Sequence, residues 1–406
     1  MLQLLPGPLA GAAARLGLRA AGRRAPGAPL ARPRAAASVS SAALPASMTE
    51  AQQEFRELAL DFAKGELLPH AARWDEEKHF PVDALRHAAS LGFGGIYVSE
   101  EFGGIGLGRK DAAVIFEALA YGDVPTTAYL TIHNMNCFVL DRFGTQEQKE
   151  RWLPRMTAME LLSSYCLTEP GAGSDAAALA TAAARDGDDY VLTGAKAFIS
   201  GGGASDVYIV LARTGGPGPG GVSCFLVEAG APGLSFGKQE VKLGWNCQPT
   251  AVVNLDGVRV PAAQRIGAEG EGFKIAMAGL DGGRINIATC SVGGAQFCLD
   301  AAHDYAATRK QFGRAIEDFQ NTQFKLADMA TGLVASRVMV YNAAEALDAG
   351  LPSATASAAM AKRFATDTCY DIANDAQQLH GGYGYLREYP VERYMRDLRV
   401  HSILEG

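Results

Sequence analysis

The segment from Tyr165 to Asp175, YCLTEPGAGSD, combines small residues with hydroxyl groups in a pattern that suits a large polar ligand. Gly171 and Gly173 lack Cβ atoms, so the backbone there can adopt unusual dihedral angles and approach a ring or a phosphate closely. Thr168 and Ser174 add hydroxyls that can form hydrogen bonds. The alternative is an ordinary surface turn, because Pro-Gly-x-Gly-Ser-Asp is more often a turn than a cofactor site when it stands alone.

Three later segments accompany it: Lys196–Gly203 (KAFISGGG), Gln378–Gly384 (QLHGGYG) and Ile403–Gly406 (ILEG). With the first segment they resemble, in order, the motifs of the acyl-CoA dehydrogenase family. The resemblance extends from about Thr49 to the end of the chain, and four motifs in order are far more specific than any one. It implies a flavoenzyme with FAD as cofactor that oxidises the bond between Cα and Cβ of an acyl-CoA thioester.

Further segments indicate a family member that acts on short branched acyl chains. They are Arg213–Pro219 (RTGGPGP), Gly244–Thr250 (GWNCQPT) and Gly282–Ala288 (GGRINIA). The expected reaction is the conversion of isobutyryl-CoA to methacrylyl-CoA, a step of valine catabolism. Straight and branched short chains differ by one methylene or one branch, worth about 1–3 kcal/mol of discrimination. The assignment of this substrate therefore rests on the resemblance.

The resemblance implies that Glu405, the glutamate of the family's Glu-Gly pair, is the catalytic base. Burial beside an acyl chain and a flavin would raise the pKa of this carboxyl group toward the value needed to accept the weakly acidic α-proton. The alternative is a terminal surface glutamate. Other branches of the family place their base on a bundle helix, at the position that corresponds to Gly283. Glycine cannot abstract a proton, so Glu405 is the only candidate that the family supports.

Asp281 and Arg284 flank a glycine pair at i and i+3 and therefore share one helical face. The resemblance implies that Asp281, Gly282, Gly283 and Arg284 lie along the substrate, with Ser174 at its pantetheine. Arg284 would balance nearby carboxylates, and Asp281 would contact the CoA portion. A plain surface ion pair is the alternative. The missing side chains of the glycine pair are expected to admit an α-methyl branch.

Two segments are expected to hold the flavin of FAD. Ser200 would form a hydrogen bond near flavin N5, and Phe198, where the family commonly has tryptophan, keeps an aromatic face against the ring. The complete set that the resemblance implies is Tyr165, Cys166, Leu167, Thr168, Glu169, Pro170, Gly171, Ala172, Gly173, Ser174, Phe198, Ile199 and Ser200.

Other cofactor contacts are expected to reach across a subunit interface. Arg309 resembles the residue that reaches the FAD pyrophosphate, for which a guanidinium fork is well suited. The residues expected at the adenosine part and the flavin edge are Phe319, Gln320, Gln378, Leu379, His380, Gly381 and Gly382. For His380, a cap at a helix end is the alternative. A shared cofactor requires at least a dimer, and the family's usual homotetramer is the expected assembly.

Composition narrows the class of protein. The 406 residues are 48% hydrophobic and 20% charged, enough for two or three domains with a large core. The net charge of -7 argues against a nucleic-acid-binding protein, which usually carries a basic excess on one face. The seven cysteines contain no Cys-x-x-Cys pair and are expected to be reduced thiols. No stretch approaches the roughly 18 to 20 apolar residues of a membrane span.

Residues 1–48 have the composition of a mitochondrial transit peptide. They contain no Asp or Glu, whereas six arginines recur among Ala, Leu, Gly and Ser. Arginine-rich, acid-free leaders direct chains into mitochondria, so the sequence predicts a protein of the mitochondrial matrix. A disordered basic tail is the alternative.

The remaining pattern predicts an α+β fold with three domains. Helical periodicity occupies residues 49–163 and begins with an expected capping box between Thr49 and Gln52. Short β-branched and aromatic runs separated by turns predict a middle β-barrel or sandwich-like domain over residues 164–272. Long helices return over residues 273–406, with an apolar stripe from Phe324 to Tyr341. The resemblance implies that this last domain is a four-helix bundle.

Two other functions stay open. Family members continue beyond the Glu-Gly pair, and a chain that ended at Gly406 would place Glu405 at a frayed terminus, where burial is hard to maintain. That would give an FAD-binding but catalytically weak truncated isoform. The other possibility is an acyl-CoA oxidase, which passes electrons to oxygen. The resemblance implies electron-transfer flavoprotein as the acceptor, and oxygen consumption without it would favour the oxidase.

Overall fold

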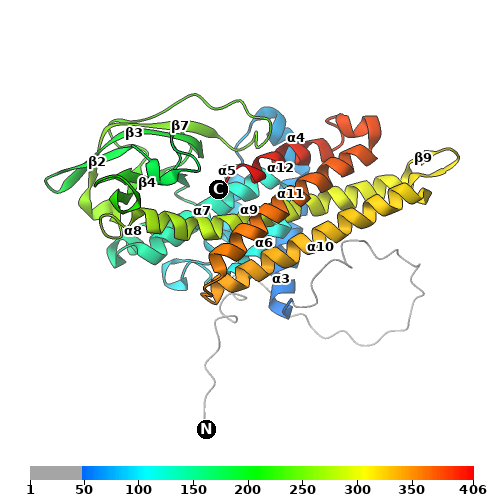
Figure 1. Ribbon diagram of the computed structural model, residues 1–406, viewed down its shortest axis with the longest axis horizontal. Helices are drawn as coiled ribbons and strands as arrows, with labels where there is room; N and C mark the ends of the chain where they lie inside the picture. Colours follow the sequence, from blue (N-terminus) through cyan, green and yellow to red (C-terminus); the bar gives the residue numbers. More distant parts are fainter. Residues whose placement is uncertain (1–47) are drawn as a thin grey trace, which may run out of the picture.

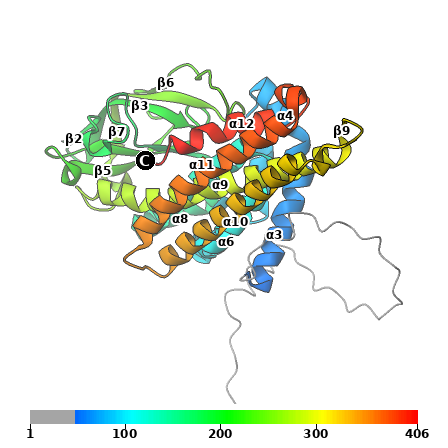
Figure 2. The same cartoon turned by 45° about the vertical axis from the view of Figure 1, so that its right-hand side comes forward.

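A computed structural model describes residues 48–406, so all but the last residue of the predicted transit peptide lie outside the described residues. The sheet domain forms one end of the molecule and the long helices cross the rest (Figure 1). The C-terminus lies where the sheet meets the helices, in this view and in the turned view of Figure 2. Among residues 48–406, no helix combines the length and the apolar character required to span a membrane.

The first domain is helical and begins with the predicted capping box. The Thr49 hydroxyl accepts a hydrogen bond from the Gln52 amide at 3.2 Å, and the Gln52 side chain accepts one from the Thr49 amide at the same distance. The helices are α3 (Glu50–Phe62), α4 (Leu68–Glu77), α5 (Val82–Ser90), α6 (Arg109–Gly122), α7 (Val124–Phe143) and α8 (Gln146–Thr157), with a π-helical turn at Ala63–Leu67. The apolar faces of α3 to α7 form one core that includes Phe55 and Phe62. The buried residues of α8 pack in another core, together with strands of the sheet.

The middle domain is a single eight-stranded sheet. Its strands are β1 (Ser163–Cys166), β2 (Ala182–Asp186), β3 (Asp189–Ser200), β4 (Val207–Arg213), β5 (Val222–Glu228), β6 (Leu234–Phe236), β7 (Thr250–Pro261) and β8 (Arg265–Ile266). The order is β6-β7-β3-β2-β4-β5-β8, and β1 pairs with β4 in parallel. This pairing carries the first two residues of the predicted flavin segment, Tyr165 and Cys166, into the sheet beside Ile209 and Val210.

The C-terminal domain is the expected helical bundle. Its helices are α9 (Gly272–Thr308), α10 (Gln320–Asp348), α11 (Ala354–Leu379) and α12 (Val391–Leu398), with a small hairpin of β9 (Lys310–Gln311) and β10 (Arg314–Ala315) between α9 and α10. Small residues such as Ala358, Ala361 and Ala365 on α11 are fully buried. They allow close packing of α11 against α9, which lie side by side in both ribbon views.

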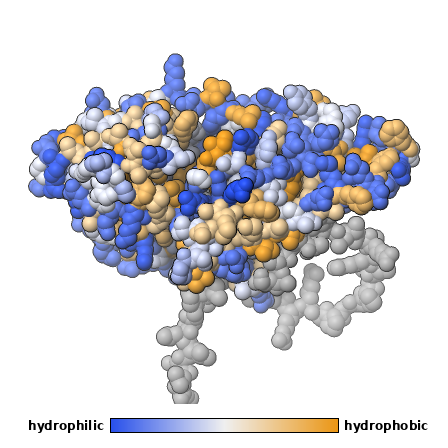
Figure 3. All heavy atoms as spheres, viewed as in Figure 1, coloured by the Kyte–Doolittle hydropathy of each residue, from blue (hydrophilic) through white to orange (hydrophobic). Residues whose placement is uncertain are grey.

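Most of the apolar stripe predicted on α10 does not face the core of this chain; Tyr341, its last residue, is the part that is buried. Phe324 is 59% exposed and Val338 is 51% exposed, whereas Met329, Leu333 and Val340 fill the interior. Helical periodicity predicted the helix correctly. Both faces of α10 carry apolar residues, so the periodicity could not show which face is buried. Figure 3 shows hydrophobic side chains at the surface over the bundle.

Candidate active site

The chain turns sharply at Glu405, whose φ of 65° lies in the left-handed region. This turn follows the 3-10 helix η9 (Arg399–Ser402). The backbone carbonyl of Glu405 accepts a hydrogen bond from Nε of Arg284 on α9 at 3.2 Å. A left-handed conformation costs a glutamate about 1–3 kcal/mol, so contacts with neighbouring elements must hold it.

The carboxylate of Glu405 is directed into the protein. Its Oε2 atom is buried and has no hydrogen-bond partner among the described residues. Burial raises the pKa of Glu405 to about 7, whereas the charges of Arg284 and Lys362 act in the opposite direction. A carboxyl group with this pKa is partly ionised near neutral pH and can therefore accept a proton there.

A cavity of about 160 Å³ lies beside this carboxylate. The predicted site residues that line it are Tyr165, Leu167, Thr168, Phe198, Ile199, Ser200, Gly283 and Glu405. The lining residues that sequence reasoning missed are Ala128, Thr131, Ile132, Met135, Trp245, Leu280, Asn286, Ile287 and Leu404. Four of these residues, from Ala128 to Met135, lie on α7. Their spacing of i, i+3, i+4 and i+7 places them on one helical face, which is the sequence pattern that could have identified them as a group.

Phe198 stands at an irregularity in β3. The register between β3 and β7 shifts between Lys196 and Ile199, and Phe198 has a φ of 57°. Its side chain is 71% exposed. A bulge turns a side chain away from the regular alternation of a strand, and here it leaves an aromatic face open at the rim of the cavity. Such a face can stack against a flat ring.

The turn after β1 leaves free space above its backbone. Reciprocal hydrogen bonds of 3.1 Å between Glu169 and Ala172 close this turn. Neither Gly171 nor Gly173 has a positive φ, so the unusual dihedral angles expected for them are absent. A Cβ at either glycine would meet nothing within 4 Å. The free space, and not the backbone conformation, is what these glycines offer a ligand.

Two residues of the first predicted flavin segment have structural side chains. Cys166 is buried in the apolar core of the sheet domain. The Glu169 carboxylate forms an ion pair with Lys196 at 2.8 Å and accepts hydrogen bonds from the amides of Ala180 and Thr181. Burial acts to raise the pKa of Glu169, but these hydrogen bonds outweigh it and the pKa is lowered. The side chains of Cys166 and Glu169 therefore make contacts within the domain.

The two glycines of α9 make room for side chains of the protein. A Cβ on Gly283 would lie 2.5 Å from Oε2 of Glu405, and a Cβ on Gly282 would clash with the Arg109 guanidinium. The expectation that this space admits an α-methyl branch is therefore wrong, because a carboxylate and a guanidinium already occupy it. The sequence alone does not show which side chains, distant along the chain, pack against Gly282 and Gly283.

Arg109 is a second feature that the sequence analysis missed. It is buried, and its guanidinium carbon lies 3.8 Å from the ring centre of Tyr97 and 4.3 Å from that of Phe138. The Tyr97 hydroxyl accepts a hydrogen bond from the Asn286 side chain, which lines the cavity. The sequence does carry an indication of this role. A basic residue in the first turn of a helix interacts unfavourably with the helix dipole, so its presence there suggests a specific interaction of its side chain.

Asp281 and Arg284 form an ion pair, but it is not the plain surface pair that was the alternative to their predicted roles. Their side chains are 3.0 Å apart and only 17% and 19% exposed. Asp281 also accepts a hydrogen bond from the Thr355 hydroxyl of α11 at 2.7 Å. The pair links α9, α11 and the C-terminal turn. Ser174 is exposed on the turn after β1 and does not line the cavity.

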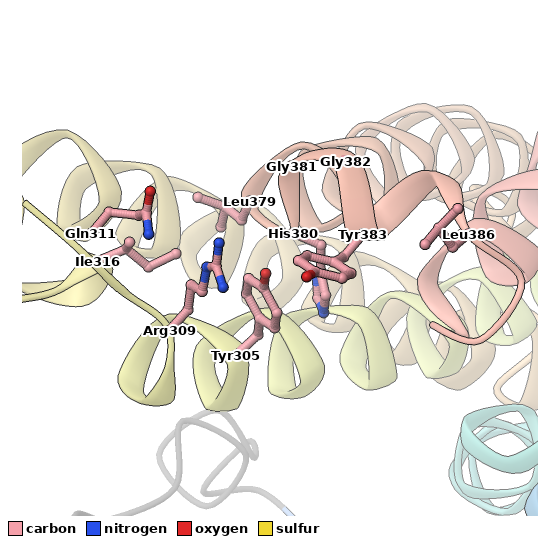
Figure 4. Close-up of a pocket in the computed structure, with 10 residues that line it drawn as sticks. All are labelled: Tyr305, Arg309, Gln311, Ile316, Leu379, His380, Gly381, Gly382, Tyr383 and Leu386. Carbon is pink, nitrogen blue, oxygen red and sulfur yellow. The ribbon is translucent and has the colours of Figure 1, made fainter.

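A second cavity, of about 390 Å³, lies at the other end of α9. Figure 4 shows Arg309 and Tyr305 facing the residues that follow α11. Of the predicted residues, this cavity brings together Arg309, Leu379, His380, Gly381 and Gly382, whereas Phe319, Gln320 and Gln378 do not line it.

His380 is the C-cap residue of α11, and its Nδ1 lies 2.8 Å from the Ala376 carbonyl oxygen. The cap that was the alternative role for this histidine is therefore present. Its ring also stacks on Tyr305 with centres 4.3 Å apart.

The two cavities are far apart in one chain. Gly283 and Tyr305 are 22 residues apart on α9 (305 minus 283), which corresponds to about 33 Å along the helix. The predicted flavin residues and the predicted pyrophosphate residue of a single chain thus belong to different sites. One cofactor that touched both kinds of residue would take them from two chains.

Comparison with known proteins identifies the class. Models of the N-terminal, middle and C-terminal domains of acyl-CoA dehydrogenase match residues 49–160, 164–258 and 270–406. The chain belongs to the acyl-CoA dehydrogenase family, and it is an FAD-dependent oxidoreductase of that family.

Individual relatives refine this assignment. The chain is 59% identical over 360 residues to the mitochondrial isobutyryl-CoA dehydrogenase of Dictyostelium discoideum, covering 88% of this chain and 86% of that one. It is 56% identical over 359 residues to the protein of the same name from Bos taurus, with the same coverage. The solved butyryl-CoA dehydrogenase of Megasphaera elsdenii is 39% identical, with a TM-score of 0.86 over 89% of this chain and 96% of that one.

The residues around the first cavity fit a flavin. The Tyr165 hydroxyl is buried there without a hydrogen-bond partner among the described residues, and the Phe198 ring is open at the rim. The space next to Gly171 and Gly173 in the nearby turn is free of other protein atoms. A flat ring with polar edges would supply both a stacking surface and hydrogen-bonding groups.

Proposed function

We propose that this protein oxidises isobutyryl-CoA to methacrylyl-CoA, with Glu405 as the base that removes the α-proton. The observation that carries the proposal is the buried Glu405 carboxylate at a cavity of about 160 Å³, whose pKa of about 7 matches a base working near neutral pH. The similarity to two isobutyryl-CoA dehydrogenases supports the choice of substrate.

The chain's own residues would divide the work as follows. The α-proton passes to a carboxylate oxygen of Glu405, and the electron pair of the broken C–H bond forms the new double bond as the β-hydrogen leaves as hydride. FAD, when bound, supplies the hydride acceptor. Tyr165, Phe198 and Ser200 would bind and orient the flavin at the cavity. Apolar side chains such as Met135 and Ile287 exclude water from the acyl group, which strengthens the electrostatic interactions of the base.

The assembly is proposed to be a homotetramer in which FAD is shared between subunits. Two observations support it: the separation of the two cavities in one chain, and the exposed stripe on α10 that includes Phe324 and Val338. Arg309 would bind the pyrophosphate of a cofactor whose flavin lies in the neighbouring subunit. Location in the mitochondrial matrix and oxidation by electron-transfer flavoprotein are proposed with it.

Anaerobic mixing of the purified, FAD-loaded protein with isobutyryl-CoA tests the function. We expect rapid bleaching of the flavin absorbance in the wild type, none in Glu405→Gln, and a normal rate in Glu76→Gln, which removes an exposed carboxylate on α4. FAD binding without bleaching in the wild type would contradict the enzyme proposal and favour a catalytically weak isoform. Rapid reoxidation by oxygen alone would favour an acyl-CoA oxidase.

A further inference from the structure

Lys362 is a buried cation close to the proposed base. It lies on the face of α11 that packs against α9, between the fully buried residues Ala361 and Ala365, and it is only 4% exposed. Among the described residues, its ammonium group has no hydrogen-bond acceptor and no carboxylate at ion-pair distance. Placing a lysine without an ion-pair partner in a nearly buried position is unfavourable, whereas leucine or methionine would fill the same position without this cost. The charge therefore requires an explanation.

The packing of α11 brings this lysine to the C-terminal turn. Thr355, two helical turns before Lys362, donates a hydrogen bond to Asp281 of α9 at 2.7 Å. Asp281 is paired with Arg284, and Arg284 holds the Glu405 carbonyl. Helix α11 also contacts η9, the turn of helix that precedes Glu405. Lys362 thus belongs to the helix that packs against the segment that carries the base, and its charge acts on Glu405.

Several polar groups surround the Glu405 carboxylate. Asp281 and Arg284 on α9 form an ion pair, and the Arg284 charge still acts to lower the pKa of Glu405. His401 of η9 is buried and neutral, because burial lowers its pKa to about 3. Burial raises the pKa of Tyr165 on β1, so this phenol also stays neutral. On α11, Lys362 interacts electrostatically with both Glu405 and Asp367. Lys362 is the only cation of this group that has no ion-pair partner among the described residues.

We propose that Lys362 is a positioning residue for the base: its buried ammonium, held behind the C-terminal turn, keeps the Glu405 carboxylate ionised and in place. The inference rests on the proposed function of Glu405 as the base. Without this charge, a carboxylate buried beside Tyr165 and Gly283 would hold its proton to higher pH and act as a base in fewer molecules. The ammonium does not touch the substrate in this scheme.

The pH dependence of flavin bleaching by isobutyryl-CoA tests this role. In Lys362→Met we expect the midpoint to rise by about one pH unit, which is about a tenfold slower rate below the midpoint. Lys362→Arg, which keeps the charge, should retain the wild-type midpoint. Lys274→Met removes an exposed lysine of α9 and should leave the profile unchanged. If Lys362→Met does not fold with bound FAD, Lys362→Gln provides the same comparison.

Substrate affinity separates positioning from binding. Isobutyryl-CoA does not react in a Glu405→Gln background, so calorimetry there should give the same Kd with and without Lys362→Met, within about twofold. A midpoint unchanged in Lys362→Met, or a Kd weakened about tenfold, would overturn the proposal. If Glu405→Gln itself bleaches as fast as the wild type, the proposed function fails. If Glu405→Gln is inactive and the Lys362 variants resemble the wild type, only the role of Lys362 fails.

Discussion

A Cβ on Gly283 would lie 2.5 Å from Oε2 of Glu405, so the carboxylate can occupy its position only because residue 283 is glycine. Real Cβ atoms do not approach other atoms so closely, so a Cβ here would force the end of the Glu405 side chain to shift. Helix α9 fixes one member of this contact and the turn after η9 supplies the other.

Gly283→Ala should therefore displace Glu405. A shift of about 1 Å in a catalytic group can cost about 10²-fold in rate, and we expect a loss of this size in flavin bleaching. Alanine is the better helix former, so the fold should remain intact. Gly279→Ala on the same helix is the control, because its Cβ would make only ordinary contacts of 3.6–3.7 Å. Equal rates in Gly283→Ala and Gly279→Ala would contradict this account.

The pH profile of kcat/KM should report the raised pKa of Glu405. The base is active when ionised, so activity is present above a midpoint near 7 and falls about tenfold per unit well below it. His401 does not contribute in this range, because burial lowers its pKa to about 3. The measurement is the rate of flavin bleaching between about pH 5.5 and 9. A rate that stays constant down to pH 5.5 would place the midpoint closer to the usual glutamate value of about 4.3 and would show that the base is solvated.

Arg109 and Gly282 form a second pair in which a glycine makes room for a charged side chain. Gly282→Ala should destabilise the protein by about 1–3 kcal/mol, because the guanidinium between Tyr97 and Phe138 cannot move without losing those rings. Denaturant unfolding measures the free energy. Arg109→Leu in the Gly282→Ala background should recover part of the loss relative to the sum of the single changes. Strict additivity would mean that the two residues do not interact.

Glu169 should be required mainly for stability. Glu169→Gln leaves the Lys196 ammonium buried without its counter-ion and should lower the free energy of unfolding by about 3–5 kcal/mol. Glu228→Gln, which breaks an exposed pair with Arg151, should cost at most about 1 kcal/mol. The folded-state pKa of Glu169 is lowered, so its stabilising contribution is present above the unfolded pKa and is lost as the pH falls. Unchanged stability with lost FAD would instead favour a direct cofactor role.

Local sequence signals predicted the local features of this fold. The capping box at Thr49, the strands around Val207 and the long bundle helices follow from spacing and residue type. The buried environments of Arg109 and Lys362 could not be predicted in this way, because each depends on which distant helix packs against it. The role of Glu405 came from motif order, since its position near the end of the chain would favour a solvated residue.

The proposed sharing of FAD between subunits makes a prediction about mixed assemblies. Arg309→Ala and Glu405→Gln should each bleach poorly alone, the first through FAD binding weakened by about 10- to 100-fold and the second through loss of the base. Co-expressed chains would form some sites with Arg309 from one subunit and Glu405 from the other, both intact, so bleaching should return in part. Lys310→Ala, at the adjacent exposed cation, should retain FAD. If both residues serve one cofactor from the same chain, every site in the mixture carries a defect and no activity returns.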